Sequence, residues 1–345
     1  MQKKLIALAV AGLVSGSAFA QSNVTIAGIV DLGYRHSSGT GLSKSGIDHG
    51  GDSGSRLIFK GTEALGNGVT ALFNLEYALG PDTNTGIASA RQTYVGLTGD
   101  FGTVVAGRLQ PMAKAVSDKY DTMASMWFSP VNSLDKAAGT TINNGIRLSN
   151  AVAYVSPKMA GGLTAQLAYS FAGASELDGN AYSGDAERIL GFGLDYDNGP
   201  VGLSLIYHRA NDLGNVVGSD ARDMLVGGSY DFGAAKVVAS WQSVKREPAD
   251  TSDKIYQLGV QVPVSAAGKV YLGYANYNKD NSSNDAKSFA VGYKHAMSKR
   301  TNFYAGYQRV ANDGAASIEV FGNTGANVGG GKNSSGYGMG VKHSF

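Results

Sequence analysis

The residues of this chain that could act on a solute are a few basic and acidic side chains within otherwise neutral segments. Arg56 and Lys60 share one face of an extended segment, and Leu57 and Phe59 share the other. Guanidinium and ammonium groups attract anions, and carboxylates facing them across water would create a transverse electric field. Such carboxylates are available in one segment without regular alternation, at Asp118, Asp121 and Asp135. We therefore expect these residues to select solutes by charge.

The residue types needed for catalysis or metal binding are scarce. The chain has no cysteine, and no two of its five histidines have a metal-ligand spacing. Ser204 and His208 could be drawn as a nucleophile and its base, but no third group that would orient them is identifiable. We expect no enzymatic activity, no metal site and no cofactor.

The N-terminus has the pattern of a secretory signal peptide. Two lysines precede an apolar run, residues 5–14, and small residues follow at 17–20. The apolar run is too short to cross ~30 Å of hydrocarbon as a helix. We predict that residues 1–20 are cleaved and that 21–345 form the mature domain. Removing two lysines and no acid takes the formal charge from +2 to 0, so charge gives no reason to expect a nucleic-acid partner.

The rest of the chain repeats one theme, segments of roughly ten residues in which apolar and polar side chains alternate. Residues 163–171 are the clearest case, and Gly-rich or Asp-rich turns such as 197–200 alternate with long polar loops such as 172–186. Short turns at one end and long loops at the other are typical of an outer-membrane barrel. We count about sixteen strands, which start near residues 23, 53, 69, 90, 103, 150, 163, 187, 201, 223, 235, 253, 269, 286, 301 and 337.

The last strand predicts how such a sheet would close. Residues 337–345 alternate to the very end and finish on Phe345, although the last residues of a domain are usually loose and polar. Lipid offers no hydrogen-bond partner, so every strand edge must pair. We expect the strand that ends at Phe345 to pair with the first strand, residues 24–30.

Soluble β-proteins are the alternative. Apolar and polar side chains also alternate along the strands of a periplasmic β-sandwich or an extracellular β-solenoid. The outer face of a sandwich, however, is usually charged. Here the less apolar face is mostly Gly, Ser, Thr, Gln and Asn, as expected beside a water-filled lumen. The 49 glycines also fit strands that bend or approach one another closely. The sequence therefore favours an all-β, antiparallel transmembrane barrel.

One connection breaks the pattern, residues 111–145. A structureless loop of this length is usually functional or disordered. Apolar residues such as Tyr120, Trp127 and Phe128 argue against disorder. We expect the segment to pack against a wall, and the barrel interior offers one.

Several motifs resemble those of a known family. They are Ser53-Gly-Ser-Arg-Leu-Ile-Phe-Lys-Gly-Thr-Glu63, Arg91-Gln-Thr-Tyr-Val-Gly-Leu, Gly107-Arg-Leu-Gln-Pro, Asn144-Gly-Ile-Arg-Leu-Ser-Asn and the Lys-His-Ser-Phe ending. Over essentially the whole mature chain, the sequence resembles trimeric general porins of the Gram-negative outer membrane, of the betaproteobacterial type.

The resemblance implies a homotrimer of sixteen-stranded barrels, each with its third extracellular loop, here residues 111–145, folded inward to narrow the pore. It also implies a basic constriction wall of Arg56, Lys60, Arg91 and Arg147, facing the acidic loop residues Asp118, Asp121 and Asp135. For Arg56 and Lys60, alternation by itself supports an orientation toward the lumen. The two side chains share one face of the strand, and an Arg facing lipid near the midplane costs roughly 2–4 kcal/mol. A lumen-facing orientation fits the alternation less well for Arg91, because Arg91 shares a strand face with the apolar residues Val95 and Leu97.

The function implied is passive diffusion of small hydrophilic solutes and ions through an outer-membrane channel. Three luminal arginines and Lys60, set against three loop aspartates, predict a mild preference for anions. The expected partners are further copies of the chain, outer-membrane lipid and lipopolysaccharide, and the outer-membrane assembly machinery, which would read Phe345 as a tag. A substrate-specific porin and a non-conducting adhesin barrel are the alternatives.

Overall fold

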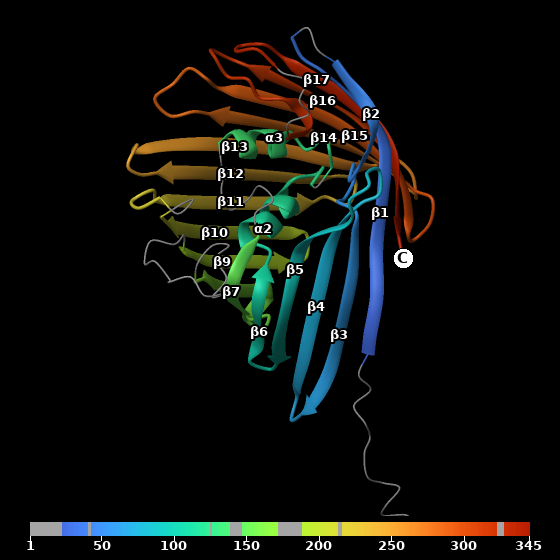
Figure 1. The fold of residues 1–345 in the computed structure, drawn as a ribbon, viewed down its shortest axis with the longest axis vertical. Helices are drawn as coiled ribbons and strands as arrows, with labels where there is room; N and C mark the ends of the chain where they lie inside the picture. The colour runs from blue at the N-terminus through green and yellow to red at the C-terminus, as the bar shows by residue number, and fades with distance from the viewer. Residues whose placement is uncertain are drawn as a thin grey trace, which may run out of the picture.

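The computed structural model describes residues 23–40, 43–124, 126–138, 147–171, 188–212, 216–322 and 328–345. They form one antiparallel sheet that closes on itself, with two short helices between β6 and β7 (Figure 1). The predicted signal peptide, residues 1–20, lies outside the described residues, as does part of the predicted loop.

The strands are β1 (Asn23–Ser38), β2 (Ser43–His49), β3 (Arg56–Gly66), β4 (Val69–Gly80), β5 (Gly86–Gly99), β6 (Gly102–Leu109), β7 (Leu148–Val155), β8 (Leu163–Ser170), β9 (Arg188–Asn198), β10 (Val201–Asn211), β11 (Ala221–Asp231), β12 (Lys236–Arg246), β13 (Thr251–Pro263), β14 (Gly268–Asn278), β15 (Ala286–Ala296), β16 (Thr301–Asn312) and β17 (Ser334–Ser344). The helices are α2 (Met112–Tyr120) and α3 (Pro130–Ala137).

The prediction of a sixteen-stranded barrel is confirmed. β2 and β3 pair with successive parts of β1, so these two segments are the halves of one barrel strand. Every other strand pairs with its sequence neighbours, and β17 returns to pair with β1. The closed sheet leaves no free edge, which is what a hydrocarbon environment requires.

The closing pair is offset from the sequence-based expectation. β17 pairs with residues 29–38 of β1, whereas residues 23–29 pair with β3. Beyond this ladder, the backbone of Phe345 exchanges two hydrogen bonds with Gly28 in the earlier part of β1, of 3.0 and 3.1 Å. Because barrel strands tilt, the last strand meets the first with a stagger rather than end to end.

Alternation sorts the side chains of each strand between two environments. On β10, Leu203 and Tyr207 are exposed, whereas the residues that follow each of them, Ser204 and His208, are buried. The other strands repeat this, with large apolar side chains exposed on one face throughout. An exposed apolar band on a closed barrel is the surface that faces lipid. None of the helices in the described residues is long and apolar enough to cross a bilayer.

The helices lie against the opposite face of the wall. α2 contacts β9 to β12, and α3 contacts β13 to β15 (Figure 1). Tyr120 at the end of α2 shares a 2.7 Å hydrogen bond with Ser204, and Gln308 Nε2 on β16 donates to the Ser129 carbonyl at 2.9 Å. Because Ser204 and Gln308 are on the face away from the exposed apolar band, the α2–α3 segment lies on the inner face of the barrel.

Glycines on the wall make this close packing possible. A Cβ atom on Gly227 would come within 2.1 Å of the Tyr120 ring, and one on Gly306 within 2.6 Å of the Phe128 ring. Real Cβ atoms do not approach carbon so closely, so only glycine leaves room for the aromatic rings at these two positions.

A second segment, residues 50–55 between β2 and β3, also turns inward. The buried carboxylate of Asp31 accepts hydrogen bonds from the amides of Asp52 and Ser53, both at 2.7 Å, and from the Tyr304 hydroxyl at 2.6 Å. The Trp127 amide then donates to the Gly51 carbonyl at 2.9 Å. Residues 50–55, which separate β2 from β3, therefore form a hydrogen-bonded contact with the α2–α3 segment.

Candidate functional site

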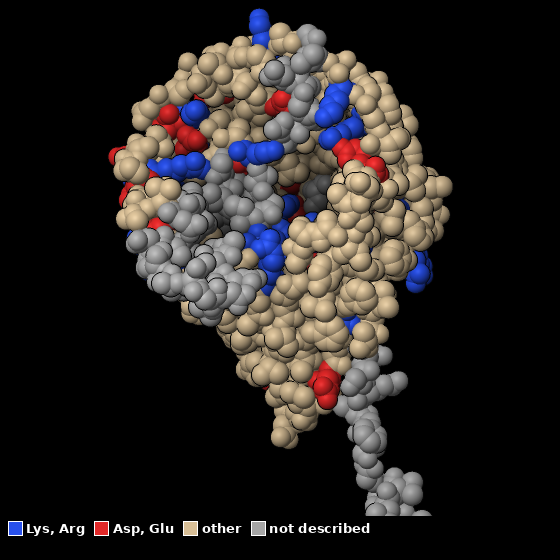
Figure 2. All heavy atoms as spheres, in the orientation of Figure 1, with Lys and Arg blue, Asp and Glu red and all other residues tan. Residues whose placement is uncertain are grey.

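The densest charge on the inner wall is where β3, β4 and β5 lie side by side. Glu76 on β4 accepts hydrogen bonds from Arg56 Nη1 at 3.2 Å and from Arg91 Nε at 2.6 Å. Gln92 Nε2 donates to its other oxygen at 3.2 Å. Only 4% of Glu76 is exposed, so the carboxylate sits beneath the two guanidinium groups. The charges of Arg56, Arg91 and Glu76 sum to +1. Basic and acidic side chains both lie around the hollow of the molecule in Figure 2.

The segment between β2 and β3 fixes the orientation of Arg56. Its Nε donates to the Gly54 carbonyl and its Nη2 to the Ser53 hydroxyl, both at 2.8 Å. With the contact to Glu76, all three nitrogens of the guanidinium are engaged. A guanidinium held in this way presents its charge at a fixed place on the wall.

A β-bulge explains why Arg91 did not fit the alternation. Leu75 pairs with Thr93 and Tyr77 pairs with Ala90, so three steps on β5 match two on β4. The extra residue lies at Arg91 or Gln92 and shifts the side chains beyond it to the other face. Arg91 therefore reaches Glu76 on the inner wall although Val95, on the same parity, is exposed outside.

Sequence reasoning missed Glu76, although a signal was present. Glu76 and Asn74 alternate with Leu75 and Tyr77, and Glu76 lies directly across from Ile58 on the face that carries Arg56. An acid at a luminal position next to an expected luminal arginine is the pattern that could have identified it.

Arg147 lies just before β7, and its guanidinium interacts electrostatically with Arg56, Glu76 and Arg91. Burial, followed by the charge of Arg91, lowers the pKa of the Arg147 guanidinium to about 10, and the charges of Arg56 and Arg108 act in the same direction. The side chain stays protonated at neutral pH. Arg108 donates from Nε to the Ala90 carbonyl at 3.0 Å and from Nη1 to Ser149 at 2.5 Å, so it ties β5 to the start of β7.

Lys60 stands apart from this cluster. It is exposed and lies on the face of Arg56, four residues further along β3 and directly opposite Asn74. Four residues of strand span about 13 Å. The structure thus places Arg56, Arg91 and Arg147 together, and Lys60 further down the same wall.

The predicted acidic residues on the α2–α3 segment are less available than expected. Asp118 on α2 pairs with Lys114 one turn earlier. Asp118 is close enough for its charge to act on Arg56. It is therefore the one acid of the three that is partly exposed and acts on the basic wall.

Asp121 is buried and bonded within its own segment. Its carboxylate accepts a hydrogen bond from the Met123 amide at 2.9 Å and another from the Ser129 hydroxyl. Burial raises the pKa of Asp121 to about 6. The placement differs from the expectation of a pore-facing acid, because these bonds use the carboxylate to hold the turn that joins the two helices.

Asp135 on α3 is buried as well. Burial raises the pKa of the Asp135 carboxyl well above its usual range, and the charges of Asp121 and Asp223 add to this effect. Only 2% of Asp135 is exposed, so it does not face the aqueous space. Most of the negative charge expected on the segment is thus paired or buried, while Arg56 and Arg91 on the wall share the carboxylate of Glu76.

Comparison with known proteins agrees with this architecture. Residues 7–315 match the family described as Gram-negative porin. The chain is 35% identical to outer membrane porin protein 32 of Delftia acidovorans over the full length of both proteins. The anion-selective porin from Comamonas acidovorans superposes with a TM-score of 0.82 and 31% identity, over 94% of this chain and 100% of that one. OmpT of Vibrio cholerae, 14% identical, shares the fold with a TM-score of 0.70 over 95% of this chain and 99% of that one.

The chain belongs to the Gram-negative porin family. The family and its fold are those of outer-membrane channels, and the exposed apolar band of this porin is the surface that such a barrel turns to lipid. At its closing seam, the Phe345 ring lies within 2.4 Å of where a Cβ atom of Gly28 would be, so Gly28 makes room for the terminal aromatic ring.

Other side chains of the porin that might have indicated catalysis do not assemble into a site. The Ser204 hydroxyl contacts Tyr120 and Asp195. Neither ring nitrogen of the buried His208 has a hydrogen-bond partner among the described residues. These two residues are therefore not joined as a nucleophile and its base.

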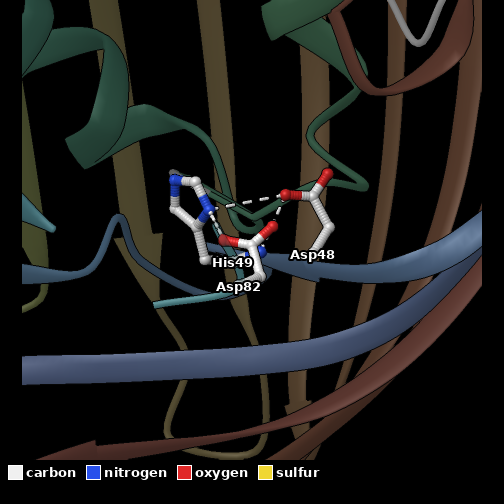
Figure 3. Close-up of side chains that lie close together, drawn as sticks. All are labelled: Asp48, His49 and Asp82. Atoms are coloured by element: carbon white, nitrogen blue, oxygen red, sulfur yellow. Dashed lines mark hydrogen bonds and ion pairs between the residues drawn. The ribbon is translucent and has the colours of Figure 1, made fainter. Parts of the chain in front are cut away.

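Within the described residues, one trio could in principle share a metal ion, Asp48, His49 and Asp82 (Figure 3). His49 Nδ1 contacts Asp82 and lies 3.6 Å from Asp48 Oδ1. Arg35 already forms an ion pair with the other oxygen of Asp48. A cation at this position would have to compete with that guanidinium, so the trio is explained as a charge network at the end of β2.

Proposed function

We propose that this porin forms a water-filled channel through which small hydrophilic solutes and ions diffuse passively, with a mild preference for anions, and that it has no enzymatic activity. The observation that carries the preference is the imbalance of charge on the inner wall. Arg56 and Arg91 share the carboxylate of Glu76, the charge of Arg147 acts on the same group, and Lys60 lies further along the same wall. A region of net positive potential concentrates anions and depletes cations.

The α2–α3 segment, with the residues up to 145, is proposed as the constriction loop. Two hydrogen bonds to the wall, between the Tyr120 and Ser204 hydroxyls and from Gln308 to the Ser129 carbonyl, support the proposal that it stays inside the channel. Asp118 would then be the acidic side of the narrowest section, opposite Arg56. Asp121 and Asp135 would act by holding the loop in shape.

Family membership supports three further proposals about partners. The porin would assemble as a homotrimer, would lie among outer-membrane lipid and lipopolysaccharide, and would be inserted by the outer-membrane assembly machinery, with Phe345 as part of the recognised strand. The anion preference named for the porin from Comamonas acidovorans is consistent with the charge imbalance of this chain.

Planar-bilayer recording tests the channel and the trimer together. We expect each insertion to add conductance in three equal steps, and a salt gradient to give a reversal potential of the sign expected for an anion-preferring pore. A reversal potential of the opposite sign would show that the reasoning from the wall is wrong. Saturable block by one solute would point instead to a substrate-specific porin, and absence of conductance to a non-conducting barrel.

A further inference from the structure

A cavity of about 440 Å³ lies on the inner wall near the start of β1, apart from the arginine cluster. Ligand pockets of proteins have volumes of ~300–1,000 Å³ and combine apolar surface with a few polar groups. This cavity has such a size and such a mixed lining. Its lining residues come from β1, β3, β4 and β5 and are Thr25, Lys60, Gly61, Thr62, Leu72, Phe73, Asn74 and Tyr94.

Strand register sets four of these side chains in one row. Lys60 pairs with Thr25 of β1 on one side and with Asn74 of β4 on the other. Asn74 in turn pairs with Tyr94 of β5. Directly opposed residues point to the same face of a sheet, and Lys60 shares the inner face with Arg56. The row therefore faces the lumen, with its ammonium group and its aromatic ring on strands that lie ~10 Å apart.

The next row along the strands forms an apolar floor. Thr62 pairs with Leu72, and Leu72 pairs with Gly96 of β5. Because Gly96 has no side chain, the wall stays flat beside the half-buried Leu72. A planar apolar group can lie on this part of the wall.

The Tyr94 ring forms the end of the cavity toward α2. It packs against the buried cluster that includes Leu109, Met112 and Tyr120, yet it is itself only partly buried. Its remaining surface lines the cavity. Aromatic rings in contact attract each other beyond the gain from burial alone, so a ring held in this way favours an aromatic solute.

Lys60 supplies a charge without a counter-charge at the other end of the cavity. Its side chain is exposed, and within the described ranges of the chain it forms no ion pair. Lys294 and Lys342, which also point inward, differ because both contact the buried carboxylate of Asp52. An ammonium group without a partner beside an apolar floor is suited to a carboxylate, which it binds by charge-assisted hydrogen bonds.

We propose that this cavity binds small aromatic carboxylates such as benzoate on their way through the pore. The carboxylate contacts Lys60, beside the hydroxyls of Thr25 and Thr62. The ring lies on Leu72 and against the ring of Tyr94. The proposal rests on the proposed function, since solutes reach the cavity through the water-filled lumen, and it adds a binding position about 13 Å along β3 from the arginine cluster.

The test is a saturation-transfer NMR titration of the detergent-solubilised porin with benzoate. The variant is Lys60→Met, and its matched control is Lys269→Met. Lys269 is also an exposed lysine of the inner face, directly opposite Lys294 on a different part of the wall. Loss of a hydrogen bond to a charged group should weaken benzoate binding to Lys60→Met by about tenfold or more. At physiological salt, where screening extends ~8 Å, Lys269→Met should change it by less than about twofold.

Further arms separate the ring from the charge. Acetate, which has no ring, and benzamide, which has no charge, should each bind the wild-type porin at least about tenfold more weakly than benzoate. Tyr94→Phe should bind benzoate as the wild type does, because the hydroxyl is not used. Tyr94→Leu removes the aromatic contact and should bind it about threefold more weakly or worse.

Three results would overturn the proposal: equal weakening by Lys60→Met and Lys269→Met, acetate or benzamide binding as tightly as benzoate, and wild-type affinity in Tyr94→Leu. Bound benzoate should leave the conductance nearly unchanged, because the cavity lies on the wall beyond the proposed constriction; block of the current would place the ligand in the constriction instead and would also overturn it. A conducting porin that does not bind benzoate contradicts this site alone. A porin that binds benzoate but does not conduct contradicts the channel proposal alone.

Discussion

Replacing Glu76 with glutamine should make the channel more selective for anions. Among the residues that the structure describes, Glu76 is the carboxylate that contacts both Arg56 and Arg91, and glutamine has nearly its shape. Its amide oxygen can still accept one of the guanidinium hydrogen bonds. The variant therefore raises the net charge of the wall by one unit while changing its packing little.

The size of the effect follows from Coulomb's law. An ion that passes about 6 Å from the lost charge through water gains or loses roughly 0.7 kcal/mol. This is about a threefold change in local concentration, upward for an anion and downward for a cation. The ratio of anion to cation permeability should then rise by up to about tenfold at low salt.

The assay is the reversal potential of the channel in a planar bilayer under a potassium chloride gradient. The matched control is Glu63→Gln, which removes the same charge from an exposed residue on β3. Screening extends ~30 Å at 0.01 M salt but only ~3 Å at 1 M. We therefore expect a clear shift for Glu76→Gln at low salt, a small one at high salt, and little change for Glu63→Gln.

Two results would refute the reasoning. If the Glu76→Gln and Glu63→Gln variants shift the reversal potential equally, the charge of Glu76 has no special position in the path of the ions. If Glu76→Gln moves the potential toward cations, the carboxylate acts mainly by holding the arginines in place, and their disorder outweighs the gain in charge.

Three further predictions concern the wall and the loop. Replacing Arg56 and Arg147 together with glutamine should bring the reversal potential close to that of a non-selective pore at low salt; an unchanged value would mean that the constriction lies elsewhere. Tyr304→Phe removes the 2.6 Å hydrogen bond to the buried Asp31 and should lower the free energy of unfolding by about 2 kcal/mol, measured by urea denaturation, whereas Tyr307→Phe on the outer face should have little effect. Because the pKa of Asp121 is raised from 3.8 to about 6, its stabilising effect is complete below pH 4 and is lost as the pH rises through 6. Relative to Asp121→Asn, wild type should lose up to about 3 kcal/mol between pH 4 and pH 8; a relative gain over that interval would contradict the assignment.

Regular alternation made most of the barrel predictable. The side-chain period of a strand is two, so a run such as 163–171 identifies both its own conformation and the face that meets lipid. Arg91 marks the limit of this rule. A single extra residue in β5 reverses the parity, and alternation cannot locate such a bulge without knowing the pairing with β4.

The inner site was predictable in its basic half only. Arg56 could be placed because an exposed arginine is costly in lipid, and the motif match supplied Arg91 and Arg147. Glu76 was missed, since its role depends on two strands that lie on either side of it. Asp121 and Asp135 were recognised as loop acids, but their burial depends on how the loop packs against the wall.

By itself, the sequence determined that this chain forms a sixteen-stranded barrel, and which of its surfaces meets lipid. Both follow from local periodicity and from the rule that strands in hydrocarbon must leave no edge unpaired. Only the tertiary structure decided which charges act on the pore. The potential of a wall depends on the distances between charges on different strands and on their burial. Here those distances let Arg56 and Arg91 share the carboxylate of Glu76 and bring the charge of Arg147 close to both, while two of the three loop acids are buried.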